Sequence, residues 1–197
     1  MSTTLPDKRR NKARAVFLDR DGTINREVDV LRNVRQLRIL PGVPRAIGAL
    51  NRLGYLVFVV TNQPVIARGW LTERGVERIH DVLRARLARQ GARIDGIFYC
   101  PHHPNATVKK YRTACRCRKP KPGMLLGAAR MHAVNLKKSF MVGDHASDIA
   151  AGKAAGVRTV KVMTSVRSND PAYAHIKADL VARNLAAAVT MIKKHGA

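Results

Sequence analysis

VFLDRDGTIN, residues 16–25, places two aspartates directly after an apolar run. Val16 to Leu18 precede Asp19, and Asp21 follows one residue later. The chain has only 13 Asp and Glu residues against 37 Lys and Arg, so this acidic pair needs a chemical reason. Residues two apart in an extended segment point the same way, and Gly22 allows a sharp turn. The stretch therefore predicts two carboxylates that converge at the end of a strand.

The remaining sequence alternates between apolar strands and amphipathic helices. Strands are predicted at 14–19, 55–60, 94–100, 139–144, 157–163 and 178–182. Helices are predicted at 43–53, 72–90, 122–134, 146–155 and 184–194, with a loop at 101–121. Thr72 is the expected N-cap of the second helix. Alternating helices and solidly apolar strands predict a three-layer, Rossmann-like α/β fold whose parallel sheet has helices on both faces.

Length and composition favour one compact unit. With 197 residues, of which 46% are hydrophobic, we expect a basic tail at 1–13 and a single domain at 14–197. No apolar run approaches the roughly 20 residues that span a bilayer, and no secretory leader is evident. Three cysteines are too few for a disulfide framework. We therefore expect a cytoplasmic monomer that has no membrane partner.

The formal net charge of +24 indicates attraction to polyanions. Phosphorylated metabolites, nucleic acid and anionic surfaces all remain possible partners on this ground. Because the basic residues are scattered along the chain, a solvated surface without a dedicated partner is an equal alternative.

The expected strand ends bring further polar residues to the acidic pair. In a parallel sheet Asp19, Thr61 and Asp144 share the carboxyl edge, where such sheets bind ligands. Converging carboxylates repel unless a cation joins them, and Mg²⁺ prefers oxygen ligands. Asp148 lies about one helical turn after Asp144. These residues predict a magnesium site at this edge.

All three cysteines lie in one basic loop, residues 100–117. Cys100-x-His102 and Cys115-x-Cys117 supply four soft or borderline ligands, which suit a tetrahedral structural zinc site. His103 could replace His102, and free buried thiols or a redox pair are the alternatives. The loop runs directly into Arg118 and Lys119, so zinc binding would also place this lysine.

The motifs together resemble the haloacid dehalogenase (HAD) superfamily of phosphatases. Asp19-Arg20-Asp21-Gly22-Thr23 matches its first motif, and Thr61, Lys119 and Gly143-Asp144 with Asp148 match the other three in order. The resemblance implies that Asp19 is the nucleophile and Asp21 the general acid and base. Thr61 and Lys119 would stabilise the transferring phosphoryl group, and Asp148 would orient Lys119. Magnesium would be held by the side chains of Asp19 and Asp144 and the backbone carbonyl of Asp21.

CPHHP, CRCRKPKPGM and TNQ…IARG narrow the resemblance to the D-glycero-D-manno-heptose 1,7-bisphosphate 7-phosphatase group and the related histidinol-phosphate phosphatases. These enzymes lack a separate cap domain. The likeness implies substrate contacts from Asn62, Gln63 and Arg118, and His145 either touches the substrate or faces solvent. Pro64-Val65 departs from the Ser-Gly expected after TNQ.

We therefore expect a magnesium-dependent phosphatase of a small phosphorylated sugar, with zinc as a structural ion. The most similar activity is removal of the 7-phosphate from the heptose bisphosphate. Histidinol phosphate or another sugar phosphate is the alternative substrate. A zinc-containing nucleic-acid binding protein is the alternative of another class, but aromatic residues make up only 5% of the chain, which disfavours base stacking.

Overall fold

The computed structural model describes residues 12–28, 30–165, 173 and 175–196. Most of the expected basic tail lies outside the described residues, so the division into tail and domain stays a prediction. Within the described ranges, no helix is long and apolar enough to cross a membrane.

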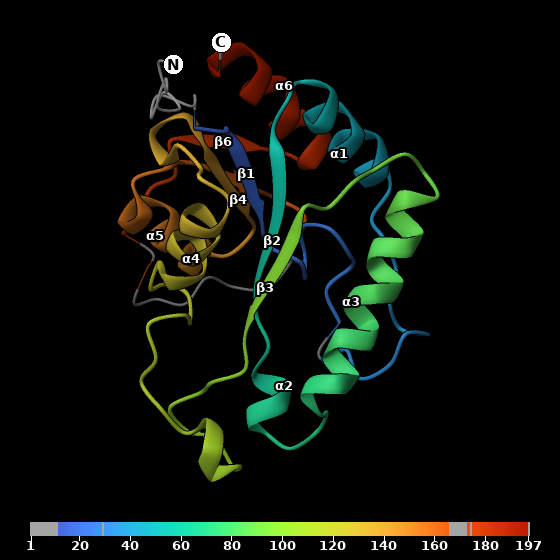
Figure 1. Cartoon of the computed structure of the whole chain (residues 1–197), viewed down its shortest axis with the longest axis vertical. Helices are drawn as coiled ribbons and strands as arrows, with labels where there is room; N and C mark the ends of the chain where they lie inside the picture. The colour runs from blue at the N-terminus through green and yellow to red at the C-terminus, as the bar shows by residue number, and fades with distance from the viewer. Residues whose placement is uncertain (1–11, 29, 166–172, 174, 197) are drawn as a thin grey trace, which may run out of the picture.

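Six parallel strands form one sheet in the order β3-β2-β1-β4-β5-β6 (Figure 1). The strands are β1 (Ala15–Leu18), β2 (Leu56–Asn62), β3 (Gly96–Cys100), β4 (Phe140–Gly143), β5 (Arg158–Val162) and β6 (Leu180–Ala182). β1 lies between β2 and β4, with Phe17 opposite Phe58 and Met141. All six predicted strands are present, although β2 continues through Thr61 and Asn62. The parallel sheet brings their carboxyl ends to one edge.

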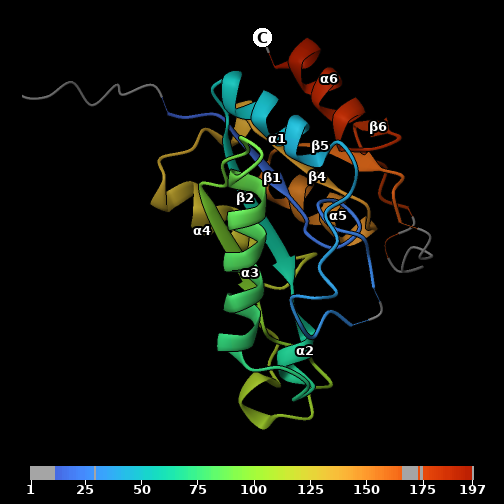
Figure 2. The same ribbon diagram turned by 90° about the vertical axis from the view of Figure 1, so that its right-hand side faces the viewer.

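Helices cover both faces of the sheet (Figures 1 and 2). One face carries α1 (Val43–Arg52), α3 (Glu73–Ala88) and α6 (Leu185–His195), and the other carries α4 (Gly123–Met131) and α5 (Ala146–Ala155). The Thr72 side chain caps α3 by accepting a hydrogen bond from the Gly75 N–H at 3.1 Å, as predicted. The three-layer prediction is confirmed.

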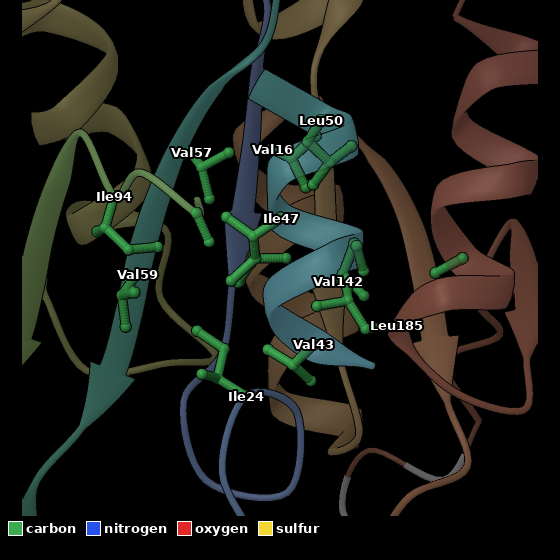
Figure 3. Packing of buried hydrophobic residues seen from close by; sticks show 14 of the residues in the cluster. Val16, Ile24, Val43, Ile47, Leu50, Val57, Val59, Ile94, Val142 and Leu185 are labelled. Carbon is green, nitrogen blue, oxygen red and sulfur yellow. The ribbon is translucent and has the colours of Figure 1, made fainter. Parts of the chain in front are cut away.

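The sheet separates the main core into two clusters, one on each face, and β1 contributes apolar side chains to both. Val16 and Leu18 pack with α1, α3 and α6, whereas Ala15 and Phe17 pack with α4 and α5. Figure 3 shows Val16 beside Ile47 and other aliphatic side chains of the first layer. Full burial of each such aliphatic side chain contributes about 1.5–3 kcal/mol. Strand β1 is thus held from both sides, and Asp19 follows it directly.

A short helix after β2 was not predicted. Helix α2 (Pro64–Ala67) begins with Pro64 in its first turn, where the missing N–H costs nothing. Val65 is buried within this turn, so the departure from Ser-Gly fits helical backbone without strain. The predicted loop at 101–121 contains one 3₁₀ turn, η1 (Lys109–Tyr111), which lies against α2. A second, η2 (Leu136–Lys138), precedes β4.

Candidate active site

The acidic pair and its expected partners meet at the carboxyl edge of the three central strands. Asp19 follows β1, Asp144 follows β4, and Thr61 lies near the end of β2. The Asp19 N–H donates to the Val142 carbonyl at 2.9 Å, which continues the pairing of β1 with β4. All three side chains are buried. The edge predicted from the sequence is therefore present.

Lys119 is buried between two carboxylates of this edge. Its ammonium donates to Asp19 Oδ1 at 2.5 Å and to the Val60 carbonyl at 2.8 Å, and lies 2.6 Å from Asp148 Oδ1. Burial alone would lower the pKa of Lys119, but Asp148 and Asp19 outweigh burial and raise it well above its usual value. Lys119 is accordingly a permanent positive charge next to the expected nucleophile.

Asn62 fixes the main chain of Lys119. Its Nδ2 donates to the Lys119 carbonyl at 3.1 Å, and its Oδ1 accepts from the Lys119 N–H at 3.0 Å. Sequence reasoning gave Asn62 only a substrate contact. Its paired hydrogen bonds instead join the end of β2 to the cysteine-rich loop.

Asp148 meets Lys119 from the first turn of α5. It also accepts a hydrogen bond from the His145 N–H at 3.0 Å, which caps the helix. A Cβ on Gly143 would come within 2.3 Å of the Asp148 carboxylate, so only glycine permits this approach. The contact expected between Asp148 and Lys119 is present.

Asp144 has the features of a cation ligand. Thr23 donates to its Oδ1 at 3.1 Å, whereas Oδ2 is buried without a hydrogen-bond partner among the described residues. Burial, and then the charge of Asp148, raise the pKa of Asp144 to about 6. Oxygen atoms of Asp19, Asp144 and Asp148 lie within 4.8 Å of one another. A hard divalent cation would satisfy the orphaned oxygen of Asp144, so Asp144 and Asp19 fit magnesium, whereas Asp148 is already paired with Lys119.

The surroundings of Asp19, the candidate nucleophile, shift its pKa in opposite directions. Burial raises its pKa well above the usual range, Lys119 lowers it, and the carboxylates of Asp148, Asp144 and Asp21 raise it again. A bound divalent cation would favour the ionised form of Asp19, which is the form that a nucleophilic carboxylate requires.

Asp21 is held in place by a set of N–H donors. Arg20 donates to both of its oxygens, from Nε at 3.2 Å and from Nη2 at 2.7 Å. Asn25 donates to Oδ1 at 2.9 Å and Gln63 to Oδ2 at 3.1 Å. Burial opposes ionisation of Asp21, but the Arg20 charge and these hydrogen bonds prevail and lower its pKa.

The cysteine-rich loop brings its four expected ligands together. Cys100, His102, Cys115 and Cys117 form one cluster, with sulfur–sulfur distances of 3.1 to 3.4 Å. His102 Nδ1 lies 3.4 Å from the Cys117 sulfur and 3.7 Å from that of Cys100. Four ligands in tetrahedral geometry at about 2.3 Å from zinc would be roughly 3.8 Å apart, so the cluster fits zinc with slight expansion.

His103 has a different environment from His102. Its Nδ1 accepts a hydrogen bond from the Asn105 N–H at 3.1 Å, and the ring is outside the cluster. Between the two histidines that the sequence left open, the structure selects His102.

A cavity of about 410 Å³ opens above these groups. The predicted site residues that line it are Asp19, Asp21, Thr61, Asn62, Gln63, Arg118, Lys119, His145 and Asp148. Arg118 donates from Nη1 to the His102 carbonyl at 3.2 Å, which ties it to the cysteine-rich loop. His145 Nε2 lies 4.0 Å from Glu27 Oε1. The cavity therefore joins residues from all four motifs with the loop.

Several residues of the site were missed by sequence reasoning. Arg20, which lies between the two aspartates, is buried with its guanidinium on Asp21. His80 on α3 contacts Arg20 from the other side at 3.0 Å. The only sequence signal for Arg20 was its place inside the motif, and His80 carried none. Glu27, Arg68 and Trp70 line the cavity and also went unnoticed.

Known proteins share this sequence and arrangement. A family profile described as HAD-hydrolase-like matches residues 116–188. The D-glycero-beta-D-manno-heptose-1,7-bisphosphate 7-phosphatase of Rhodopseudomonas palustris is 47% identical over 73% of this chain and 79% of its own length. The enzyme of the same name from Escherichia coli K12 is 41% identical over 91% of this chain and 94% of its own.

A solved structure supports the same relationship. The D,D-heptose 1,7-bisphosphate phosphatase of B. bronchiseptica, complexed with magnesium and phosphate, has a TM-score of 0.82 and 32% identity, covering 92% of this chain and 99% of that chain. The motif set, the cavity and these similarities agree. The chain belongs to the heptose 1,7-bisphosphate 7-phosphatase family of HAD phosphatases.

Proposed function

We propose that this protein removes the 7-phosphate of D-glycero-D-manno-heptose 1,7-bisphosphate through an aspartyl-phosphate on Asp19. The observation that carries the chemistry is Lys119, buried 2.5 Å from Asp19 and 2.6 Å from Asp148 beneath the cavity. A cation fixed beside a nucleophilic carboxylate is the arrangement that phosphoryl transfer needs. The names of the relatives support the choice of substrate.

In the first half of the reaction, the Asp19 carboxylate attacks phosphorus and the bond to the sugar oxygen breaks. Asp21 gives its proton to the leaving oxygen, so this step draws on the protonated form of Asp21, which its lowered pKa makes the minor form. Lys119 and the Thr61 hydroxyl donate hydrogen bonds to the transferring oxygens. Gln63 donates to Thr61 Oγ1 at 2.9 Å, which leaves the hydroxyl proton of Thr61 to point elsewhere.

In the second half, the Asp21 carboxylate takes a proton from water as this water attacks phosphorus. Asp19 is released and inorganic phosphate forms, so the enzyme returns to its initial state. Splitting the hydrolysis in this way replaces one difficult step by two easier ones.

Magnesium would be held by Asp19, the backbone carbonyl of Asp21, and Asp144, whose Oδ2 otherwise lacks a partner among the described residues. Bound there, it would neutralise charge on the phosphoryl oxygens that face the buried carboxylates. Zinc in the cysteine cluster would have four protein ligands and no open position, so its role would be structural.

Arg118 is the proposed contact for the phosphate that stays on the sugar. Arg118 lines the cavity, and a guanidinium fork matches phosphate oxygens. Asn62, Gln63 and His145 line the same cavity and would border the sugar.

Phosphate release measured over a substrate panel tests this function. The panel holds both anomers of the heptose bisphosphate, heptose 7-phosphate, histidinol phosphate and a 5′-phosphorylated oligonucleotide. We expect magnesium-dependent turnover with the highest kcat/KM for a heptose bisphosphate, and ³¹P NMR should show the 1-phosphate retained. Asp19→Asn should abolish turnover.

The matched control is Asp81→Asn, which changes an exposed aspartate on α3 and should leave turnover intact. A preference for histidinol phosphate would overturn the substrate and retain the phosphatase. Salt-sensitive oligonucleotide binding that survives Asp19→Asn, without any phosphate release, would overturn the enzymatic function itself.

A further inference from the structure

Arg20 is a buried charge that the proposed chemistry leaves without a role. Only 1% of its surface is exposed, and no larger side chain is buried so completely among the described residues. Removing a guanidinium from water is costly unless its donors are satisfied. Its contacts therefore indicate what the charge is for.

The guanidinium holds Asp21 with two N–H groups. Nε reaches Oδ1 and Nη2 reaches Oδ2, so the pair is bidentate and fixes the plane of the carboxyl group. A lysine at this position could supply the charge but not the fork. The bidentate contact with Arg20 thus fixes the orientation of the Asp21 carboxyl group and also places a positive charge beside it.

His80 and Gln63 hold the guanidinium from behind. Gln63 Oε1 accepts from Nη2 at 3.0 Å, and His80 Nε2 lies 3.0 Å from Nη1. Because a guanidinium only donates, His80 Nε2 must be the acceptor and its ring must be neutral. Burial, followed by the Arg20 charge, lowers the pKa of His80 to about 3, which agrees with a neutral ring. This contact links helix α3 to the turn after β1, which carries Arg20 and Asp21.

The contacts on Asp21 differ in how easily they can be released. Its two oxygens accept from Arg20, Asn25 and Gln63 together, so proton transfer requires one contact to open. Gln63 Nε2 also donates to Thr61, and Asn25 Nδ2 to the Arg26 carbonyl, both at 2.9 Å, so either amide keeps one bond if it leaves Asp21. Of the two, only Gln63 lines the cavity where the leaving oxygen would lie. Arg20 has no such freedom because its buried donors would be orphaned.

We propose that Arg20, aligned by His80, is a positioning residue that holds the Asp21 carboxyl for proton transfer, while Gln63 is the contact that opens. This inference rests on the proposed phosphatase chemistry. In that chemistry the proton passes from Asp21 to the leaving oxygen as the phosphorus–oxygen bond breaks and the bond to Asp19 forms. If the Asp21 carboxyl group is wrongly oriented, the rate should fall most for substrates whose leaving group needs that proton.

The test compares two leaving groups by kcat/KM, which reports the half-reaction that forms the aspartyl-phosphate. The sugar phosphate has a poor leaving group that needs a proton, and 2,4-dinitrophenyl phosphate has a good one that does not. For His80→Leu, which removes the acceptor, we expect kcat/KM to fall about 10- to 100-fold for the sugar phosphate. For the dinitrophenyl ester the fall should be about threefold or less. His80→Gln retains an acceptor and should recover most of the lost activity.

Two further variants keep the result interpretable. Arg20→Lys retains the charge without the fork and should show the same leaving-group dependence as His80→Leu. Ile79→Val on α3 removes only a buried methyl group and should affect both substrates equally and weakly. Equal losses for both substrates in His80→Leu and Arg20→Lys, or no loss in either, would overturn the inference. If the parent protein hydrolysed neither ester, the proposed function would fail instead.

Discussion

Gly22 controls how closely the turn after β1 approaches Asp144. Its φ is +80°, and a Cβ at this position would lie 2.2 Å from Asp144 Oδ2. That oxygen is the one without a hydrogen-bond partner among the described residues. The glycine is therefore required twice, by its backbone conformation and by the space next to the proposed magnesium ligand.

Replacing Gly22 with alanine should weaken magnesium binding because the new methyl group displaces Asp144. We expect the magnesium concentration for half-maximal activity to rise about 10- to 100-fold, as for other changes that misplace a ligand. The measurement is a magnesium titration of phosphate release. Gly42→Ala is the matched control: its φ is +77° but nothing lies within 4 Å of its Cβ position. It should cost about 1–2 kcal/mol of stability and leave the titration unchanged.

Residues of the site differ in how far the sequence could predict them. Motif order and strand ends predicted a common location for five residues, and the structure places them at one edge of the sheet: Asp19, Asp21, Thr61, Lys119 and Asp144. Asn62 and Gln63 were expected at the substrate, and their hydrogen bonds to Lys119 and Asp21 emerged only from the structure. His80 could not be found, because it meets Arg20 only through the packing of α3 on the sheet.

At the scale of elements, strong periodicity was predictable and short segments were not. Both faces of β1 are buried, which its continuous apolar run indicated. Helix α2 has only four residues, and a run as short as Pro64–Ala67 carries no helical period to recognise. The cysteine-rich loop has little regular structure, so its shape depends on its cluster.

Cys115→Ser should remove zinc and displace Lys119. Serine can still accept the hydrogen bond that the Arg118 N–H gives to the Cys115 sulfur at 3.3 Å, but it is a poor zinc ligand. We expect zinc to fall from one equivalent per chain and kcat to drop about 10- to 100-fold, because Lys119 follows the loop. Metal analysis and phosphate release measure the two effects.

His103→Gln provides the control for the zinc prediction. His103 neighbours the cluster in sequence but lies outside it, so zinc content and kcat should both remain at the parental level. Loss of zinc in His103→Gln, with retention in His102→Gln, would show that the ligand was assigned to the wrong histidine. Full activity in a zinc-free Cys115→Ser would show that zinc binding in the loop does not position Lys119.

At the scale of the whole molecule, the order of the strands does not follow from the sequence. Alternating strands and helices indicated a parallel sheet, but many strand orders satisfy that pattern. The observed order puts β1 between β2 and β4, and this adjacency brings Thr61, Asp19 and Asp144 together. In a parallel sheet all strands end at the same edge whatever their order, so these residues could be placed together from the sequence although the strand order could not be predicted.

His80 should make the free energy of unfolding of the whole protein depend on pH. The ring is buried, and burial and the nearby charges of Arg20 and Arg84 lower its pKa to about 3, while Asp21 acts in the opposite direction. In the unfolded chain, histidine titrates near 6.5. Below that pH the unfolded state binds a proton that the folded state excludes, so stability is lost as the pH falls from about 6.5 toward 3.

Replacing His80 with glutamine removes this proton-binding difference and retains the acceptor for Arg20. From pH 7 to pH 5, the protein should lose about 2 kcal/mol more unfolding free energy than the variant does. Urea denaturation at several pH values measures both curves. The same replacement at His195, which is exposed on α6, should leave the slope of the parent unchanged. Parallel curves for His80→Gln and the parent would mean that the folded ring takes up a proton as readily as the unfolded one, which the Arg20 hydrogen bond forbids because a protonated ring cannot accept it.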